Sequence, residues 1–136
     1  MATFRGSCLC GEVVFEVEGP FDRFLNCHCS RCRKASGTAH SCEVIVKAMA
    51  LRWLHGEASV VRFDLPHARS FATAFCKRCG SRLFSRRTNG SVVGVALAGF
   101  DDRNAFAPTE HIWLSAKMDW VRIDDGLKQY PESVPQ

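Results

Sequence analysis

The chain is patterned in short β-prone runs, in which apolar and polar positions alternate or apolar residues follow one another. Alternation with a period of two is typical of strands that bury one face, and continuous apolar runs are typical of strands that bury both. The dipeptide Asn89-Gly90 separates the last two runs and is a strong hairpin signal. The predicted strands are Glu12–Glu18, Ser41–Val46, Ala58–Phe63, Ser70–Phe75, Arg82–Ser85 and Ser91–Leu97.

Helix is scarce in this pattern. About one turn is expected at Ser30–Ala35, where Ser30 is placed to cap the first turn, and another at Asp101–Ala105. Many short strands with so little helix predict a mainly β fold built from small antiparallel sheets.

The length of 136 residues and the mass of 15.2 kDa fit one domain. No repeat or linker divides the sequence, so we expect a single domain over residues 1–136 with its core at about residues 5–131. Hydrophobic residues at 46% and charged residues at 24% exclude disordered, collagen-like and coiled-coil classes. The net charge of +4 is too modest to indicate a nucleic-acid partner by itself.

Cysteine is the unusual component, with 8 residues in the chain. The longest mostly apolar run, Val92–Phe100, is far shorter than the ~20 residues of a membrane helix, and the first residues resemble no secretory leader. The sequence therefore predicts a cytoplasmic protein without membrane contact. Since cytoplasmic thiols are kept reduced, clustered cysteines there indicate metal ligands more than disulfides.

The cysteines other than Cys42 fall into three groups. In Cys-x-Cys on an extended segment both side chains leave the same face, and in Cys-x-x-Cys a tight turn brings both thiols onto one ion. Each group is therefore a plausible half of a metal site. The groups are Cys8-Leu9-Cys10-Gly11, Cys27-His28-Cys29-Ser30-Arg31-Cys32 and Cys76-Lys77-Arg78-Cys79-Gly80.

These thiols divide naturally into four and three. Structural zinc is closed by four ligands, whereas catalytic zinc keeps three protein ligands and one exchangeable position. The two pairs would close a structural zinc site through Cys8, Cys10, Cys76 and Cys79. The triplet of Cys27, Cys29 and Cys32 would hold a second, open zinc, so two zinc ions per chain are expected. Completion of the triplet by His28 or Cys42, which would make a second closed site, stays open as an alternative.

The chemistry of an open three-thiolate zinc favours a small thiol as its substrate. Three thiolates leave such a site with a formal charge of −1, which makes it a poor activator of water. Zinc nevertheless lowers the pKa of a thiol that binds to it, and the thiolate so formed stays nucleophilic.

At this point the sequence resembles the glutathione-dependent formaldehyde-activating enzyme family, also called the centromere protein V/formaldehyde-activating domain. The resemblance covers Arg5 to Pro131. It is carried by the motifs Ser7-Cys8-Leu9-Cys10-Gly11, Cys27-His28-Cys29-Ser30-Arg31-Cys32-Arg33-Lys34-Ala35-Ser36-Gly37, Phe75-Cys76-Lys77-Arg78-Cys79-Gly80-Ser81, and the closing stretch from His111-Ile112-Trp113 through Trp120 to Asp125-Gly126-Leu127.

The resemblance implies small zinc-pinned antiparallel sheets of the β-tent type and the same division of the cysteines between a structural and a catalytic zinc. It also implies the partners, namely glutathione and formaldehyde. Their condensation to S-hydroxymethylglutathione is formally the reverse of a carbon–sulfur lyase reaction.

Basic residues beside the triplet are candidates for holding an anionic thiol. Arg31, Arg33 and Lys34 are placed to pair with its carboxylates, although such a run is more often a solvated face. The histidines carry no metal spacing, and His28 should face away from an ion shared by its two neighbours. The other histidines are expected to be structural or to lie on the surface, and His111 is the one most open to a functional role, because it lies in the family-like closing stretch. Cys42 is expected to be a small buried apolar side chain.

Two other functions compete with the enzyme. In one, both zinc sites are structural and the domain is a non-catalytic module that recognises protein or nucleic acid, against which the modest charge argues. In the other, Cys76 and Cys79 exchange disulfides, against which the missing βαβ context argues.

Overall fold

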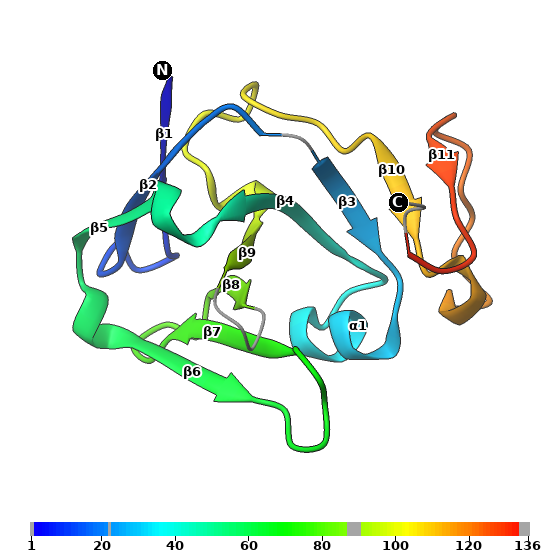
Figure 1. The fold of residues 1–136 in the computed structure, drawn as a ribbon, viewed down its shortest axis with the longest axis horizontal. Coiled ribbons are helices and arrows are strands. Elements are labelled where there is room, and N and C mark those ends of the chain that lie inside the picture. Colours follow the sequence, from blue (N-terminus) through cyan, green and yellow to red (C-terminus); the bar gives the residue numbers. More distant parts are fainter. Residues whose placement is uncertain (1, 22, 87–90, 134–136) are drawn as a thin grey trace.

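The fold is mainly β, as the sequence predicts. The computed structural model describes residues 2–21, 23–86 and 91–133 (Figure 1). One α-helix, α1 (Ser30–Ser36), accompanies short 3₁₀ turns at Ala48–Ala50, Glu57–Ser59, Leu97–Gly99 and Leu114–Ala116. The strands are β1 (Thr3–Ser7), β2 (Val14–Glu18), β3 (Arg23–Cys27), β4 (Ser41–Lys47), β5 (Leu51–His55), β6 (Val60–Asp64), β7 (Ala72–Cys76), β8 (Arg82–Arg86), β9 (Val92–Ala96), β10 (Glu110–Ile112) and β11 (Lys128–Gln129).

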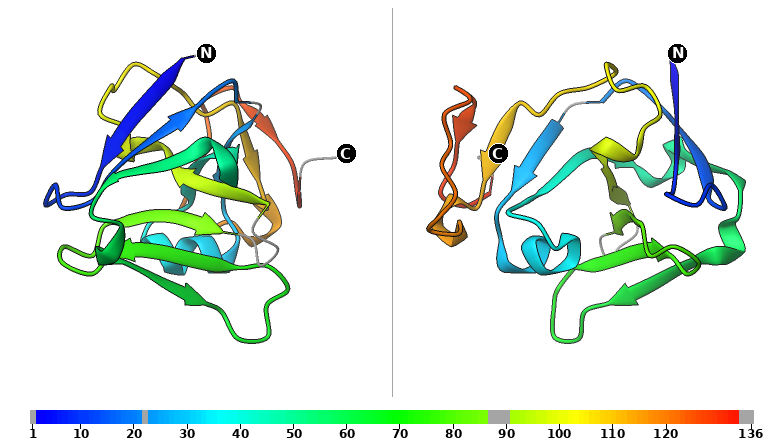
Figure 2. Two further views of the ribbon diagram at one scale, coloured as in Figure 1. Left: turned by 60° about the vertical axis from the view of Figure 1, so that its left-hand side comes forward. Right: turned by 180° about the vertical axis from the view of Figure 1, so that it is seen from behind.

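Two sheets are formed. The smaller has the order β1-β2-β5, and the larger has eight strands in the order β11-β10-β3-β4-β9-β8-β7-β6. Neighbouring strands are antiparallel except at one end of the large sheet, where β10 runs parallel to both β3 and β11. Figure 2 shows the small sheet and the β10–β11 end of the large sheet on opposite sides of the molecule.

The core lies where the two sheets face each other. Phe15 of β2 is 1% exposed, and its ring centroid lies 5.2 Å from that of Phe84 and 5.8 Å from that of Phe100. Val44 and Val95, paired across β4 and β9, are fully buried beside them. A second cluster, formed by Leu25, Cys27, Cys32 and Ile112, packs at the far end of β3. The ends of β1, β3 and β7 are thereby fixed, and these ends carry the cysteines.

Each of the six predicted strands has a counterpart in the structure, but β1, β3, β5, β10 and β11 were not predicted. The expected helix at Asp101–Ala105 is wrong. Asp102 forms a turn there, with its side chain accepting from Asn104 N–H at 2.9 Å and its carbonyl from Ala105 N–H at 3.2 Å. Aspartate competes with helix in this way because its short side chain bonds its own backbone. The Asn89-Gly90 turn lies outside the described residues.

Within the described part of the chain, no helix is long and apolar enough to span a membrane.

Candidate metal centres

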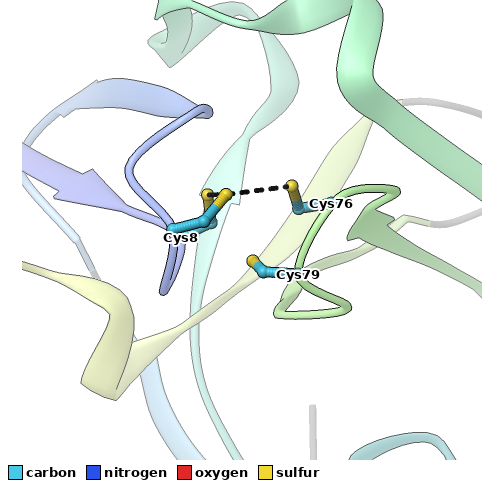
Figure 3. Close-up of side chains that lie close together, drawn as sticks. Cys8, Cys76 and Cys79 are labelled. Carbon is cyan, nitrogen blue, oxygen red and sulfur yellow. Dashed lines mark hydrogen bonds between the residues drawn. The ribbon is translucent and has the colours of Figure 1, made fainter.

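Four cysteine thiols from two distant segments meet beside the small sheet. Cys8 and Cys10 follow β1, while Cys76 ends β7 and Cys79 lies in the turn before β8. The Sγ atoms of Cys8 and Cys10 are 3.6 Å apart, those of Cys10 and Cys76 are 3.9 Å apart, and all four lie within 4.8 Å of one another. Figure 3 shows Cys8 on one side facing Cys76 and Cys79 on the other. The structure thus joins segments that are 66 residues apart in the chain.

Glycines shape both turns of this four-cysteine cluster. Gly11 and Gly80 have φ values of 80° and 77°, a region that glycine adopts without the strain that a Cβ would cause. Gly11 N–H donates to the carbonyl of Cys8 at 3.1 Å, and Gly80 N–H donates to that of Cys76 at 2.7 Å. The two thiols of each pair are thereby turned to the same side.

The thiols of the four-cysteine cluster are shifted in opposite directions, since the pKa of Cys10, which the backbone of Glu12 lowers, is raised to about 11 by desolvation and by the neighbouring thiols. Hydrogen bonding with the side chain and backbone of Ser81 lowers the pKa of Cys79 to about 5. The backbone N–H of Val13 donates to Cys8 Sγ at 3.2 Å. Cys8 and Cys76 are buried, so a cation is needed before all four thiols can ionise there. Four thiolates with this closeness are typical ligands of structural zinc.

A three-cysteine cluster joins the end of β3 to the start of α1. Cys27 is the last residue of β3, Cys29 is the N-cap of α1, and Cys32 lies in its first turn. Their Sγ atoms lie within 4.8 Å of one another. The backbone N–H of Cys32 donates to Cys29 Sγ at 3.3 Å, so the predicted capping by Ser30 is wrong. The helix begins at Ser30, as predicted, but Cys29 caps it, because the thiol three positions before Cys32 reaches the N–H of Cys32.

The three-cysteine cluster cannot ionise fully without a cation. Hydrogen bonding with Cys27 and then Cys32 lowers the pKa of Cys29 to about 2. The same contact with Cys29, together with Cys32 and burial, raises the pKa of Cys27. One thiolate is therefore stabilised at the expense of its neighbours, and a divalent cation would remove that conflict. The donor set fits zinc with three protein ligands.

A cavity of about 640 Å³ opens in front of the three-cysteine cluster, and all three of its cysteines line the wall. The remaining wall is mostly apolar and includes Leu25, Ile45, Phe71, Ile112 and Trp113. The cysteines of the other cluster do not line it. An ion held by Cys27, Cys29 and Cys32 would therefore face a space large enough for a small ligand.

The three basic candidates lie in different places. Arg31 lines the cavity. Arg33 points away from it, with Nε donating to the carbonyl of His28 at 3.2 Å and Nη1 lying 3.1 Å from Met118 Sδ. Lys34 is exposed and does not line the cavity. The helical period separates these side chains although they are close in sequence.

A buried chain of hydrogen bonds runs behind the three-cysteine cluster, and sequence reasoning missed it. His28 is 0% exposed, and its Nε2 lies 2.9 Å from Nδ1 of His111, whose Nε2 lies 2.7 Å from Asp125 Oδ2. Because the Asp125 carboxylate only accepts, His111 donates to it and accepts from His28. His40 packs on the same imidazoles, with ring centroids 4.7 Å from His28 and 5.7 Å from His111. No spacing in the sequence brings these residues together.

Burial lowers the pKa of His28 to about 4, helped by the charges of His40 and His111. The imidazole therefore stays neutral at physiological pH. Its side chain does not join the three thiols as a fourth ligand within the described residues, and neither does that of Cys42. Burial also raises the pKa of Cys42 to about 11, which keeps this half-buried thiol protonated at physiological pH.

Glu43 is a second residue that the sequence analysis overlooked. It lines the cavity from β4, although it is only 7% exposed. Arg82 Nη1 lies 3.0 Å from its Oε1, and Ser85 Oγ donates to its Oε2 at 2.9 Å. The sequence offered one signal for Glu43, namely a charged residue inside the otherwise apolar run Ser41–Val46. In a strand, Glu43 points to the same face as the residues two positions before and after it.

Comparisons with known proteins agree with this geometry. The profile of the family described as glutathione-dependent formaldehyde-activating enzyme matches residues 3–116. A crystal structure of a Rhodobacter sphaeroides protein superposes with a TM-score of 0.60 at 22% sequence identity, over 93% of this chain and 98% of that one, which shows a shared fold. No curated protein matches the chain significantly. Since the family profile covers both cysteine clusters, the chain belongs to the glutathione-dependent formaldehyde-activating enzyme family.

Proposed function

We propose that the protein is a zinc-dependent enzyme of the carbon–sulfur lyase type, acting in the cytoplasm. It adds a small thiol, glutathione, to an aldehyde such as formaldehyde, and the product is S-hydroxymethylglutathione. Cys8, Cys10, Cys76 and Cys79 would hold a structural zinc, and Cys27, Cys29 and Cys32 a catalytic one. Membership of the family supports the choice of glutathione and formaldehyde.

The observation that carries the proposal is the contrast between the two clusters. Four thiols meet in a set that leaves no position free, whereas three thiols line a cavity of about 640 Å³. Closed sites stabilise folds, and open sites exchange ligands. A recognition module with two structural zinc ions would have no use for a cavity beside only one of them.

When bound at the three-cysteine cluster, zinc supplies stabilisation of a substrate thiolate by lowering its pKa. The protein's own residues provide the rest. Apolar side chains such as Phe71 and Trp113 exclude water from the space in front of the thiols, and Arg31 is placed to pair with a carboxylate of the thiol. Holding thiol and aldehyde together in that space removes the entropy cost of their encounter.

The reaction is balanced without any redox partner. The thiol sulfur forms a bond to the aldehyde carbon, and the carbonyl π electrons move onto oxygen. The thiol loses one proton from its sulfur and the carbonyl oxygen gains one, so the product is the S-hydroxymethyl adduct of the thiol.

Exchange spectroscopy tests the proposal directly. Glutathione and ¹³C-formaldehyde combine without a catalyst, so the rate of magnetisation exchange between free and thiol-bound carbon is compared with and without the zinc-loaded protein. We expect the protein to accelerate this exchange, and Cys29→Ser to abolish the acceleration. Cys42→Ser is the matched control, because Cys42 belongs to neither cluster. Equal exchange rates with and without the wild-type protein would contradict the proposal.

A further inference from the structure

The three-cysteine cluster is embedded in a small apolar cluster of its own. Cys27 and Cys32 are buried there together with Leu25 and Ile112. Apolar surface that faces a cavity is stabilised when the hydrocarbon of a ligand displaces water from it. Further apolar members of this cluster are only partly buried and line the cavity of about 640 Å³, namely Ile45, Phe71 and Trp113.

The floor of the cavity runs along β3 and β4, away from the thiols. Cys27 pairs with Ser41 at the thiol end, Leu25 pairs with Glu43 further along, and Ile45 follows on β4. All five residues line the cavity. At about 3.3 Å per residue, the floor from Ser41 to Ile45 spans about 13 Å. A ligand that reacts at the thiols can therefore place several carbon atoms over Leu25 and Ile45.

Charged side chains add little to this floor. Among the described residues that line the cavity, the charged ones are Arg31 and Glu43. Arg82 Nη1 lies 3.0 Å from Glu43 Oε1, Ser85 Oγ donates to Oε2 at 2.9 Å, and the Glu43 side chain is only 10% exposed. The charge of Glu43 is therefore satisfied inside the protein. Arg31 remains for a carboxylate of the ligand, and the floor remains for hydrocarbon.

The C-terminal segment holds Trp113 at the cavity in an uncommon backbone conformation. Its φ of 60° and ψ of 41° lie in the left-handed region, which bulky residues rarely adopt. Trp113 N–H donates to the carbonyl of Glu132 at 2.9 Å, and Leu114 N–H donates to that of Tyr130 at 3.2 Å. Such conformations cost free energy and are concentrated at functional sites, so a role for this aromatic residue in ligand binding is favoured.

We propose that the aldehyde partner of this site carries an apolar chain, which Leu25, Ile45 and Trp113 recognise. The inference rests on the proposed function and extends its carbonyl substrate beyond formaldehyde, which has no carbon outside its carbonyl group and cannot use this wall. Glutathione, with its carboxylates, ammonium and amides, has little hydrocarbon to place there either. The thiol sulfur bonds to the aldehyde carbon, the carbonyl oxygen gains the proton that the sulfur loses, and the product is a hemithioacetal.

A homologous series of aldehydes tests the inference on the wild type. Acetaldehyde, propanal, butanal and pentanal differ only in chain length, and exchange spectroscopy on the zinc-loaded full chain with fixed glutathione gives the KM of each free aldehyde. We expect KM to fall about fourfold for each added methylene, which is the gain from burying one CH₂ group. KM values that stay constant or rise with chain length would overturn the inference.

Ile45→Thr locates the effect on the floor of the cavity. The substitution keeps a β-branched side chain in β4 and puts a hydroxyl where hydrocarbon is expected to bind. The ratio of the KM for acetaldehyde to the KM for pentanal should fall severalfold. Val61→Thr is the matched control, since Val61 is a β-branched residue of β6 that does not line this cavity, and its ratio should equal that of the wild type. An unchanged ratio in Ile45→Thr would contradict the role of the floor.

Unreactive alcohols separate this inference from the proposed function. Ligand-observed NMR with 1-propanol, 1-butanol and 1-pentanol measures binding to the zinc-loaded full chain without any reaction, and we expect the affinity to rise with chain length. If formaldehyde exchange is accelerated but the affinity for alcohols does not depend on chain length, the proposed function stands and this inference is overturned. If the alcohols bind as expected but no aldehyde exchange is accelerated, the proposed function fails and the inference about its substrate falls with it.

Discussion

Replacing His111 by phenylalanine removes the centre of the buried hydrogen-bond chain while keeping a ring of similar size. His111 is 3% exposed and links the fully buried His28 to Asp125. In His111→Phe the Nε2 of His28 loses its partner, and an unpaired buried donor costs about 1–3 kcal/mol. The bond to Asp125 adds little, because that carboxylate is 43% exposed. We therefore expect the free energy of unfolding to fall by about 2 kcal/mol.

His111→Phe should affect metal binding at the two cysteine clusters unequally. His28 lies between Cys27 and Cys29, and its backbone N–H donates to the carbonyl of Ile112 at 3.0 Å, next to His111. Loosening this segment should weaken metal binding at the three-cysteine cluster and leave the four-cysteine cluster intact.

Urea unfolding gives the stability, and competition with a chelator gives the two metal affinities. Asp124→Asn serves as the control, since Asp124 is an exposed acid beside Asp125, and its unfolding free energy should change by less than about 0.5 kcal/mol. A His111→Phe protein as stable as this control, with both metals held as firmly as in the wild type, would refute the reasoning.

Three further predictions follow from the same geometry. The pKa of His28 is about 4 in the folded chain against the ordinary 6.5, so the unfolded chain binds a proton there at higher pH than the folded one does. Stability should therefore decrease as the pH falls from about 6.5 to about 4, and His28→Gln should show a shallower decrease in thermal unfolding scans over this window. Arg31→Ala should raise the KM for glutathione severalfold, because Arg31 alone of the three basic candidates lines the cavity, whereas Lys34→Ala should leave KM unchanged; equal KM values for both variants would remove Arg31 from substrate binding. Cys76→Ser should unfold the domain, as followed by circular dichroism, since Cys76 is 0% exposed and joins the two halves of the four-cysteine cluster; a folded variant would show that this cluster is dispensable.

Much of the fold could be predicted from local pattern, and the missing parts have a common physical cause. β4 and β9 are buried apolar runs, so their residues alone indicate strands. β10 and β11 are only three and two residues long, and they become strands because β10 aligns on the edge of β3 and β11 aligns on β10. β3 itself contains Arg23 and Asn26, which interrupt its apolar pattern. Such strands are set by tertiary pairing rather than by propensity.

The candidate site divides in the same way. Cysteine spacing carries its own geometry, because two thiols at Cys-x-Cys or Cys-x-x-Cys must point to one side, so both clusters were accessible from the sequence. The histidine chain and Glu43 were not, since they depend on which strands become neighbours. His28 and His111 are 83 residues apart, and Glu43 meets Ser85 only because Gly94 lies between their strands without a side chain.

Zinc stoichiometry tests the central claim, that the seven clustered thiols form one closed and one open site. Elemental analysis is carried out on freshly purified wild type, on Cys29→Ser and on the control Cys42→Ser, and zinc-edge absorption is recorded while glutathione is added. The account predicts two zinc ions in the wild type and the control, one in Cys29→Ser with the fold retained, and an added zinc–sulfur contact on titration of the wild type. The account would be contradicted by two zinc ions whose zinc-edge absorption does not change when glutathione is added. It would also be contradicted if Cys29→Ser and Cys76→Ser unfolded the domain to the same extent.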